Sequence, residues 1–370
     1  MANILDYIDW RGDLPFSVSP FNEVDNLLLS QMSYVPFDGV LAAAGSVTIA
    51  EAARRFFTLH TEEEVHKTVS FTKDAAFVLK KAGESVRFRD LPLTHYVNHI
   101  DLSTDEQFSA LCVSLPDGTV FVAYRGTDDT IVGWKEDFNM SFLSPVPSQL
   151  AAVDYLQCVA ADFTGALLLG GHSKGGNLAV YAAIHTDAAI KQRIQIVYNN
   201  DGPGFDAATV ASEAYCAMMP RIRTIVPQSS IIGMLLEHEE EYTVVKSSNT
   251  GLLQHDAMSW QVIGAHFDTA ETLSGGAKLL DASLHAWLQK MTREQREVFV
   301  DTLFGVLDAT NAKTLGDLSG NAWQSLSGAA SALTHMNADD RTCFTKTLGM
   351  LFRESGHIVK QQLTVPHSEA

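Results

Sequence analysis

Residues 167–179 constrain the fold most strongly, because an apolar run leads into a glycine-rich turn and a small-residue helix leads out of it. The segment reads Leu-Leu-Leu-Gly-Gly-His-Ser-Lys-Gly-Gly-Asn-Leu-Ala and contains Gly171-x-Ser173-x-Gly175. Glycine two positions before and after a serine lets a strand and a helix approach closely without a Cβ clash. The Gly-x-Ser-x-Gly pattern is a weak signal by itself, and the flanking strand and helix make it a strong one. We therefore expect Ser173 on a strained turn at the top of a sheet, with its hydroxyl exposed as a nucleophile.

The surrounding sequence predicts a mostly parallel sheet that helices cover on both faces. Pro116-Asp117-Gly118 predicts a hairpin between its two flanking runs. Beyond the hairpin, continuous apolar strands alternate with helical segments, which is typical of an α/β fold. The expected strands are 108–115, 119–124, 166–170, 194–199, 222–226 and 242–247, and the expected helices are 148–163, 175–186 and 206–218.

The chain of 370 residues is long enough for one large domain with additions. We expect a helical N-terminal extension over 1–90, the α/β core over 91–265 and a helical C-terminal region over 266–370. Within the extension, Asn22 or Asp25 can begin a helix, and Thr61 precedes three glutamates that suit a helix start. Thr292 and Gln295 fit a capping box in the C-terminal region.

Charge and cysteine usage narrow the class of partner and compartment. The formal net charge of −18 argues against nucleic acid or anionic membrane surfaces as partners. No segment reads as a signal peptide or a membrane span, and the four cysteines are scattered without a Cys-x-x-Cys pair. We therefore expect a cytoplasmic protein without integral membrane association.

A second motif lies upstream of the serine. Residues 120–127 read Val-Phe-Val-Ala-Tyr-Arg-Gly-Thr, followed by Asp128, Trp134 and Asp137. This is where such folds carry the first donor of an oxyanion hole, and the second donor is the backbone N–H after the nucleophile, here Lys174.

Together the two motifs resemble the class 3 (fungal-type) lipases over about 90–265. The N-terminal Asp-Tyr-Ile-Asp-Trp-Arg-Gly-Asp (6–13) and Phe-Asn-Glu-Val-Asp (21–25) resemble a narrower bacterial branch, the Mbeg-like hydrolases, over nearly the whole chain. The resemblance implies an α/β-hydrolase fold. It also implies that Thr127 supplies a backbone N–H and a hydroxyl to the oxyanion, and that carboxylic esters are the substrates.

A triad needs a base downstream of the acid, in the order serine, acid, histidine. His255 follows the expected strand 242–247 and is the preferred base. His238 lies among glutamates and His266 lies further on, and both stay open as alternatives. His185 comes too early, on the helix after the serine. His172 adjoins the serine, but adjacent residues on such a turn point apart, so we interpret it as structural.

The acid is harder to place. Class 3 lipases usually carry an aspartate after the strand equivalent to 222–226, and here Val226-Pro227-Gln228-Ser229-Ser230 has no carboxylate. The preceding strand ends in Asp201-Gly-Pro, which resembles the acid-bearing turn of pancreatic-type lipases. Asp201 is therefore the preferred acid, because functional groups gather at the carboxyl ends of parallel strands. Asp256 and Glu237 remain alternatives.

These residues predict a serine hydrolase that cleaves small-molecule esters or thioesters of short to medium acyl chains. Ser173, His255 and Asp201 would form the triad, with Thr127 and Lys174 at the oxyanion. No metal or cofactor is implied. Two other functions stay open: a catalytically silent binding or scaffold protein, and an acyltransferase with the same triad. The apolar run 231–236 could line an acyl pocket or belong to a core helix.

Overall fold

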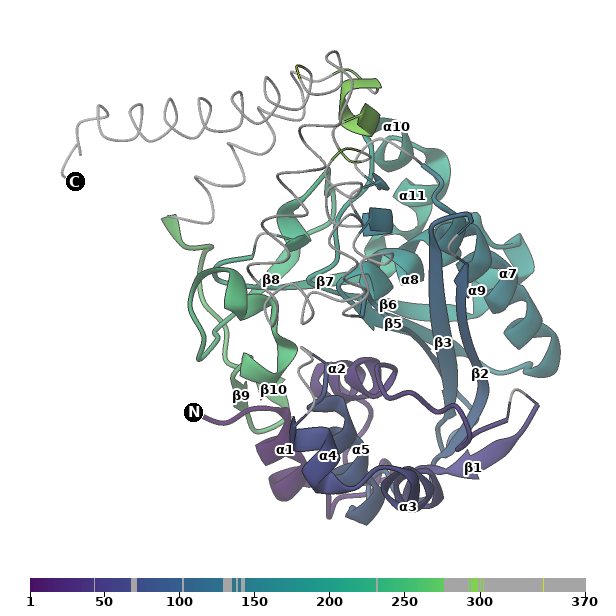
Figure 1. Ribbon diagram of the computed structural model, residues 1–370, viewed down its shortest axis with the longest axis vertical. Coiled ribbons are helices and arrows are strands. Elements are labelled where there is room, and N and C mark those ends of the chain that lie inside the picture. The colour runs from purple at the N-terminus through teal and green to yellow at the C-terminus, as the bar shows by residue number, and fades with distance from the viewer. Residues whose placement is uncertain are drawn as a thin grey trace.

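An eight-stranded sheet forms the centre of the protein, with the strands in chain order from β1 to β8 (Figure 1). The computed structural model describes residues 1–275 except 43, 68–71, 102, 129–134, 138, 141–143 and 231, and further along the chain 292, 294–298, 300, 302 and 342. Neighbours are antiparallel from β1 to β4 and parallel from β4 to β8. The strands are β1 (Ser46–Thr48), β2 (Pro92–Asp101), β3 (Glu106–Ser114), β4 (Val120–Tyr124), β5 (Leu167–His172), β6 (Ile194–Asn200), β7 (Ile222–Pro227) and β8 (Tyr242–Val245). A separate two-stranded sheet joins β9 (Val262–Ile263) and β10 (His266–Phe267).

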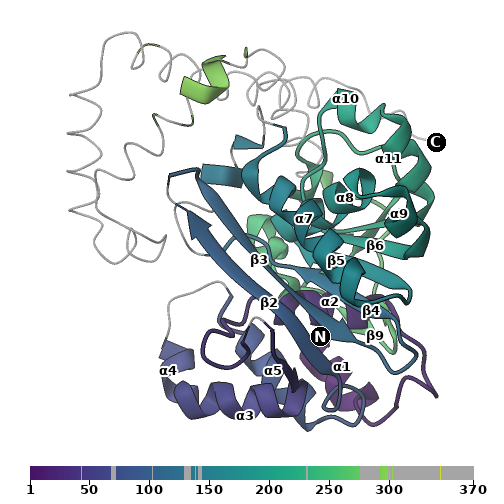
Figure 2. The same ribbon diagram turned by 90° about the vertical axis from the view of Figure 1, so that its right-hand side faces the viewer.

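Helices cover both faces of the sheet (Figure 2). One layer holds α7 (Pro147–Asp162), α8 (Lys174–His185), α9 (Ala188–Arg193), α10 (Ala207–Val210) and α11 (Glu213–Met218). The opposite layer holds α1 (Ile4–Arg11), α2 (Glu23–Met32), α3 (Ile49–Leu59), α4 (Glu62–Lys67) and α5 (Ala75–Glu84). This arrangement confirms the expected α/β-hydrolase fold.

Strand β5 shows why the two layers need each other. Successive side chains of a strand point to opposite faces. Leu167 and Leu169 are buried in the cluster formed with α7 and α8, whereas Leu168 is buried with the N-terminal helices. An apolar run of this kind is stable only where both faces are covered.

Several expected boundaries are confirmed and others are corrected. Asn22, not Asp25, begins α2, because its side chain accepts the backbone N–H groups of Val24 and Asp25. The expected helix 206–218 is divided into α10 and α11, since Ser212 caps a new helix start by accepting the N–H of Tyr215.

The expected helical N-terminal stretch also contributes an edge strand, because β1 pairs with β2, and the sequence did not reveal either strand. Four 3₁₀ turns complete the described elements: η1 (Met219–Arg221), η2 (Ile232–Met234), η3 (Gly251–His255) and η4 (Ala257–Ser259).

Most of the expected helical region 266–370 lies outside the described residues. At its start β10 is extended rather than helical. The capping box is confirmed, because Thr292 N–H donates to Gln295 Oε1 at 3.0 Å and Gln295 N–H donates to Thr292 Oγ1 at 3.2 Å. Within the described residues, no helix combines the length and apolarity needed to cross a membrane.

A buried ion pair fixes the N-terminal helices to one another. Arg87 Nε donates to Asp25 Oδ1 at 2.8 Å and Arg87 Nη2 bonds the second carboxylate oxygen, with both side chains fully buried. Tyr7 Oη also donates to Asp25 Oδ1 at 2.8 Å, and Arg87 Nη1 donates to the carbonyl of Ser19 at 2.8 Å. The pair therefore joins α1, α2 and the segment after α5 through satisfied polar contacts.

We expect Arg87→Met to lower the free energy of unfolding by about 3–5 kcal/mol, because Asp25 would be left buried without its cation. Urea denaturation measures the change. The control is Lys80→Met, which removes an exposed pair with Glu62 and should cost about 0–1 kcal/mol. Equal losses in the two variants would show that the buried pair has no special importance.

Candidate active site

Ser173 lies on a strained turn between β5 and α8. Its backbone has φ 58° and ψ −134°, a region that residues with a Cβ rarely occupy. Ser173 N–H donates to the carbonyl of Asn200 at 2.9 Å, and Ser173 C=O accepts from Gly176 at 2.9 Å. The turn is thus fixed on both sides, and α8 begins at the next residue.

The two glycines of the motif are required by close packing. A Cβ at Gly171 would lie 2.3 Å from the Gly175 carbonyl oxygen, and one at Gly175 would lie 2.2 Å from the carbonyl oxygen of Tyr124. These contacts are to backbone atoms, which cannot swing away. The glycines therefore permit the close approach of β4, β5 and α8 that places Ser173.

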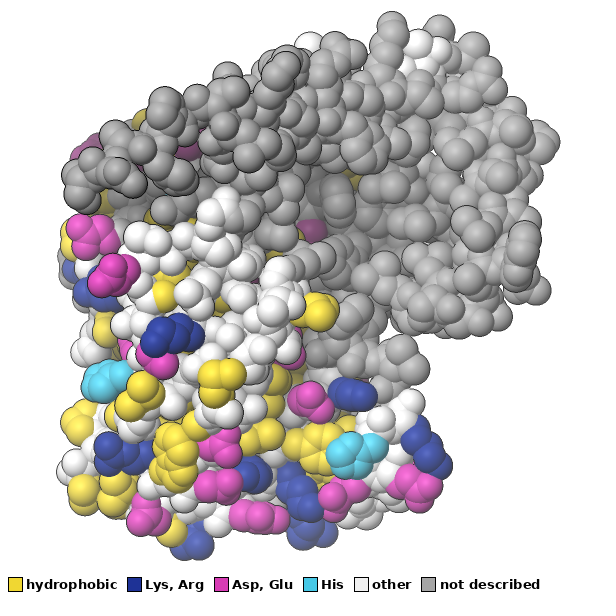
Figure 3. All heavy atoms as spheres, turned by 90° about the vertical axis from the view of Figure 1, so that its left-hand side faces the viewer, with side chains coloured by type: hydrophobic (Ala, Val, Ile, Leu, Met, Phe, Trp, Pro, Cys, Tyr) yellow, Lys and Arg dark blue, Asp and Glu magenta, His cyan; other side chains and the backbone are white. Residues whose placement is uncertain are grey.

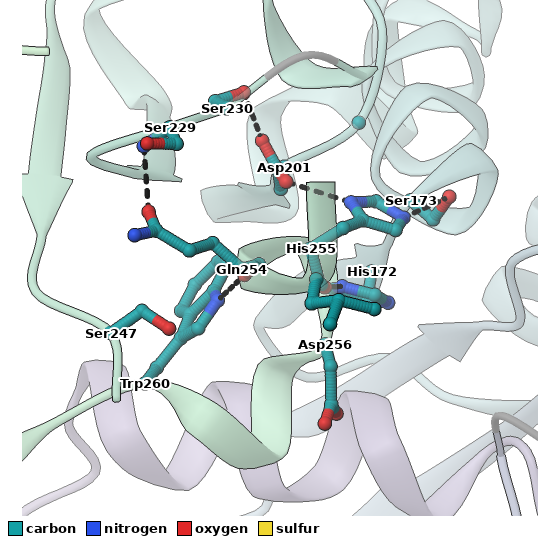
Figure 4. A network of polar contacts seen from close by, with 12 residues as sticks. His172, Ser173, Asp201, Ser229, Ser230, Ser247, Gln254, His255, Asp256 and Trp260 are labelled. Atoms are coloured by element: carbon teal, nitrogen blue, oxygen red, sulfur yellow. Dashed lines mark hydrogen bonds and ion pairs between the residues drawn. The ribbon is translucent and has the colours of Figure 1, made fainter. Parts of the chain in front are cut away.

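Ser173, His255 and Asp201 form a hydrogen-bonded chain (Figure 4). His255 Nε2 lies 3.0 Å from Ser173 Oγ, and His255 Nδ1 lies 2.7 Å from Asp201 Oδ2. Because a carboxylate can only accept, Nδ1 carries the hydrogen and Nε2 presents its lone pair to the serine hydroxyl. Ser173 comes from the turn between β5 and α8, Asp201 follows β6, and His255 ends η3.

Asp201 is fully buried and held from three sides. Its backbone has φ 53° and its N–H donates to the carbonyl of Ile225 at 2.8 Å. Ser230 Oγ donates to the oxygen that His255 does not use. Ser230 follows β7, the strand that carries no carboxylate, so the hydroxyl at that position bonds the carboxylate that follows β6.

The alternative residues make other contacts. The backbone of Glu237 exchanges hydrogen bonds with Phe205 at 2.9 and 3.0 Å, and His255 Nδ1 is bonded to Asp201. Asp256 instead caps η4 by accepting Met258 N–H at 3.0 Å and points away from His255 (Figure 4). His238 pairs with Glu240 at 3.0 Å, while the exposed His266 is nearest to Glu23, at 3.7 Å.

The loop that carries His255 is itself braced. Gln254 accepts the N–H of Ser229 at 2.7 Å through its side chain, and its backbone carbonyl accepts Trp260 Nε1–H at 2.9 Å. Trp260 is fully buried. The sequence showed no sign of these supports, since they join residues through tertiary contacts.

Thr127 and Lys174 each have an acidic partner, the partly buried Asp137 and the buried Glu136. Thr127 Oγ1 donates to Asp137 Oδ2 at 2.6 Å, and burial raises the pKa of Asp137 to about 6. Lys174 Nζ bonds Glu136 at 2.7 Å and the carbonyl of Gln107 at 2.9 Å, with the lysine and glutamate side chains almost wholly buried. The lysine side chain therefore points into the protein, while its backbone N–H lies in the first turn of α8, where the helix dipole favours negative charge.

The apolar run after β7 contributes at least one side chain to the core. Met234 packs against the buried cluster of Val226, Val244 and Leu273. Gly233 lies against the acid, because a Cβ there would be 2.2 Å from Asp201 Oδ1. This segment thus packs against Asp201.

The chain resembles one known protein family over most of the described residues. The model of the family described as Mbeg1-like matches residues 82–305. No curated protein matches the chain.

Among solved structures, the chain is similar to the native lipase–propeptide complex of Rhizomucor miehei, with 15% identity and a TM-score of 0.34 over 51% of this chain. That match covers 65% of the Rhizomucor chain, just under two thirds. The M37 lipase gives 18% identity and a TM-score of 0.31, over 47% of this chain and 70% of its own. A triacylglycerol lipase from Penicillium expansum gives 14% identity and a TM-score of 0.30, over 50% and 82%.

We expect Gly175→Ala to destabilise the protein by about 1–3 kcal/mol, because the new methyl group would press on the backbone of Tyr124. Gly275→Ala is the matched control, since nothing lies within 4 Å of a Cβ at that position. Urea denaturation of both variants measures the difference. An unchanged urea midpoint for Gly175→Ala would contradict the tight packing of the turn at Ser173.

Proposed function

This chain belongs to the Mbeg1-like family, and from that premise we propose that it is a serine hydrolase that cleaves carboxylic esters or thioesters. The observation that carries the proposal is the hydrogen-bonded chain from Ser173 through His255 to Asp201, built on a strained turn. A nucleophile, a base within reach and a carboxylate that orients the base are the parts that acyl transfer needs.

In the proposed reaction Ser173 Oγ attacks the carbonyl carbon while its proton passes to His255 Nε2. The tetrahedral intermediate collapses, and His255 returns the proton to the departing alcohol or thiol. A water molecule then gives a proton to His255 and attacks the acyl group. Collapse of the second intermediate releases the carboxylic acid and returns the proton to Ser173.

Asp201 would keep His255 in the tautomer that accepts a proton from serine and would stabilise the imidazolium that forms. Ser230 supports this role, because its hydroxyl occupies the other carboxylate oxygen and limits the rotation of Asp201. An acid held in this way needs no rearrangement when the positive charge develops.

The oxyanion would be bound by the backbone N–H of Lys174 and by Thr127. With Asp137 ionised, the Thr127 hydroxyl donates to it, and Thr127 offers only its backbone N–H. With Asp137 protonated, the acid can donate to Thr127 Oγ1 and release the threonine hydrogen for the oxyanion. Each such donor is worth about 10²–10³ in turnover.

We propose soluble esters or thioesters of short to medium acyl chains as substrates. The net charge of −18 disfavours an anionic lipid surface. On the described part of the face in Figure 3, acidic and basic side chains lie among apolar ones, so that face has no single-sign field to steer a charged partner. A series of p-nitrophenyl esters of increasing chain length tests this preference, and strong activation by a lipid–water interface would contradict it.

We expect Ser173→Ala to abolish both ester hydrolysis and labelling by a fluorophosphonate probe while the protein stays folded, because no other described group takes the place of the attacking oxygen. Labelling followed by gel fluorescence measures this. Ser109→Ala is the control, since Ser109 is buried and its hydroxyl has no hydrogen-bond partner. Labelling of Ser173→Ala at the wild-type rate would show that Ser173 is not the nucleophile.

We expect Asp201→Asn to lower kcat by up to about 10⁴-fold, the scale seen when a triad acid is replaced in another fold. The physical reason is that the amide can favour the wrong imidazole tautomer. Asp256→Asn is the control, because Asp256 adjoins His255 but bonds Met258, and its kcat should stay near the wild-type value. If the two variants lose activity equally, Asp201 is not the acid.

A further inference from the structure

The hydroxyl of Tyr34, which follows α2, lies against the histidine that precedes the nucleophile. Tyr34 Oη is 3.1 Å from His172 Nδ1 and 3.2 Å from the backbone carbonyl oxygen of His172. Both side chains are more than nine-tenths buried. The N-terminal region thus reaches the strand that ends at Ser173.

The other nitrogen of His172 reaches the loop of the base. His172 Nε2 lies 2.8 Å from the backbone carbonyl oxygen of His255, and the two rings lie 4.7 Å apart between centroids (Figure 4). A carbonyl oxygen only accepts, so Nε2 carries the hydrogen and donates it. Burial, with a smaller effect of His255, holds the pKa of His172 well below its usual range. The ring is therefore neutral, and its Nδ1 and the backbone carbonyl of His172 both lie within reach of the single hydrogen of the Tyr34 hydroxyl.

Gly126, next to Thr127, lies at the same point. A Cβ at Gly126 would be 2.2 Å from Tyr34 Oη, 2.4 Å from the carbonyl oxygen of His172 and 3.1 Å from Ser173 Cβ. The end of β4, the nucleophile turn and the Tyr34 hydroxyl therefore meet in one tightly packed place. A shift of Tyr34 would therefore displace both the segment after β4 and the turn at Ser173.

Further bonds join the N-terminal helices to the same two segments. Asn26 Nδ2 donates to Asn200 Oδ1 at 2.9 Å, and Asn200 Nδ2 donates to the carbonyl of Gly171 at 2.9 Å. Asn3 Nδ2 donates to the carbonyl of Met258, three residues after His255, also at 2.9 Å. The N-terminal helices thus bond to the nucleophile strand and to the loop of the base at separate points.

We propose that Tyr34 and His172 are positioning residues that fix His255 against Ser173, through the hydrogen bonds from Tyr34 to His172 Nδ1 and from His172 Nε2 to the carbonyl of His255. This inference rests on the proposed serine hydrolase function. In the proposed reaction His172 takes no proton; its ring lies against the His255 ring and its Nε2 bonds the His255 backbone. His172 holds the backbone of His255. Tyr34 fixes which nitrogen of the His172 ring donates.

Two substitutions at His172 separate positioning from simple packing. His172→Phe fills the space but has neither donor nor acceptor. His172→Gln offers an amide N–H to the His255 carbonyl and an amide oxygen to Tyr34. We expect His172→Phe to lower kcat about 10²-fold with KM unchanged, the scale of a small misplacement of a catalytic group. We expect His172→Gln to recover most of that loss.

Tyr34→Phe should lower kcat by less than His172→Phe. The double variant should lose no more than His172→Phe alone, because residues that act through one contact are not additive. His185→Phe is the matched control on α8, where the ring stacks on Tyr181, and its kcat should match the wild type. All kcat and KM values are measured with p-nitrophenyl butyrate.

A second measurement does not depend on activity. In protein labelled with ¹⁵N-histidine, the downfield proton resonance of His255 Nδ1–H reports its bond to Asp201. It should be lost or broadened in His172→Phe and kept in His172→Gln. If wild type reacts with neither ester nor fluorophosphonate, the proposed function fails while this resonance still tests the positioning. A resonance and a kcat unchanged in His172→Phe, or equal losses in the Phe and Gln variants, would overturn the proposal.

Discussion

The strained backbone of Ser173 is the constraint on which the rest of the site depends. A residue with a Cβ holds φ 58° and ψ −134° only where its surroundings enforce it. Here the enforcement comes from the carbonyl of Asn200, from the start of α8 and from glycines that allow backbone-to-backbone contact. The core of the sheet therefore holds the turn in its strained conformation, and a looser core would relax it. The sequence predicts an exposed serine hydroxyl, whereas Ser173 is only 8% exposed, because its hydroxyl lies against His255.

The same edge explains how Asp201, which directly follows β6, reaches His255. In parallel strands the carboxyl ends lie together, so neighbouring strands can serve one histidine. Asp201 follows β6 and Ser230 follows β7, and the hydroxyl of Ser230 bonds the carboxylate. The base loop is then braced by Trp260 and Gln254 and by contacts with the N-terminal helices. In this arrangement the N-terminal helices are part of the scaffold of the site.

The sequence predicted the elements whose formation depends on residues close together in the chain. The strand–turn–helix at Ser173, the hairpin at Pro116–Gly118 and the core strands of the sheet have short-range signatures of apolar runs and glycines. The edge strand β1 and its neighbour β2 were missed, since β1 has only three residues and β2 is partly exposed and lacks a continuous apolar run. The bonds of Tyr34 to His172 and of Glu136 to Lys174 were missed for another reason. They join residues 138 and 38 positions apart, and no local pattern records such a contact.

In the proposed reaction Ser173 attacks a carbonyl whose oxygen is bound beside the start of α8. A crystal structure of the protein after reaction with a fluorophosphonate tests it most directly. We expect phosphorus bonded to Ser173 Oγ, and the phosphonyl oxygen within about 3.1 Å of the backbone nitrogens of Lys174 and Thr127. His255 Nδ1 should still be bonded to Asp201. An adduct on another residue, or a phosphonyl oxygen that contacts neither nitrogen, would contradict it.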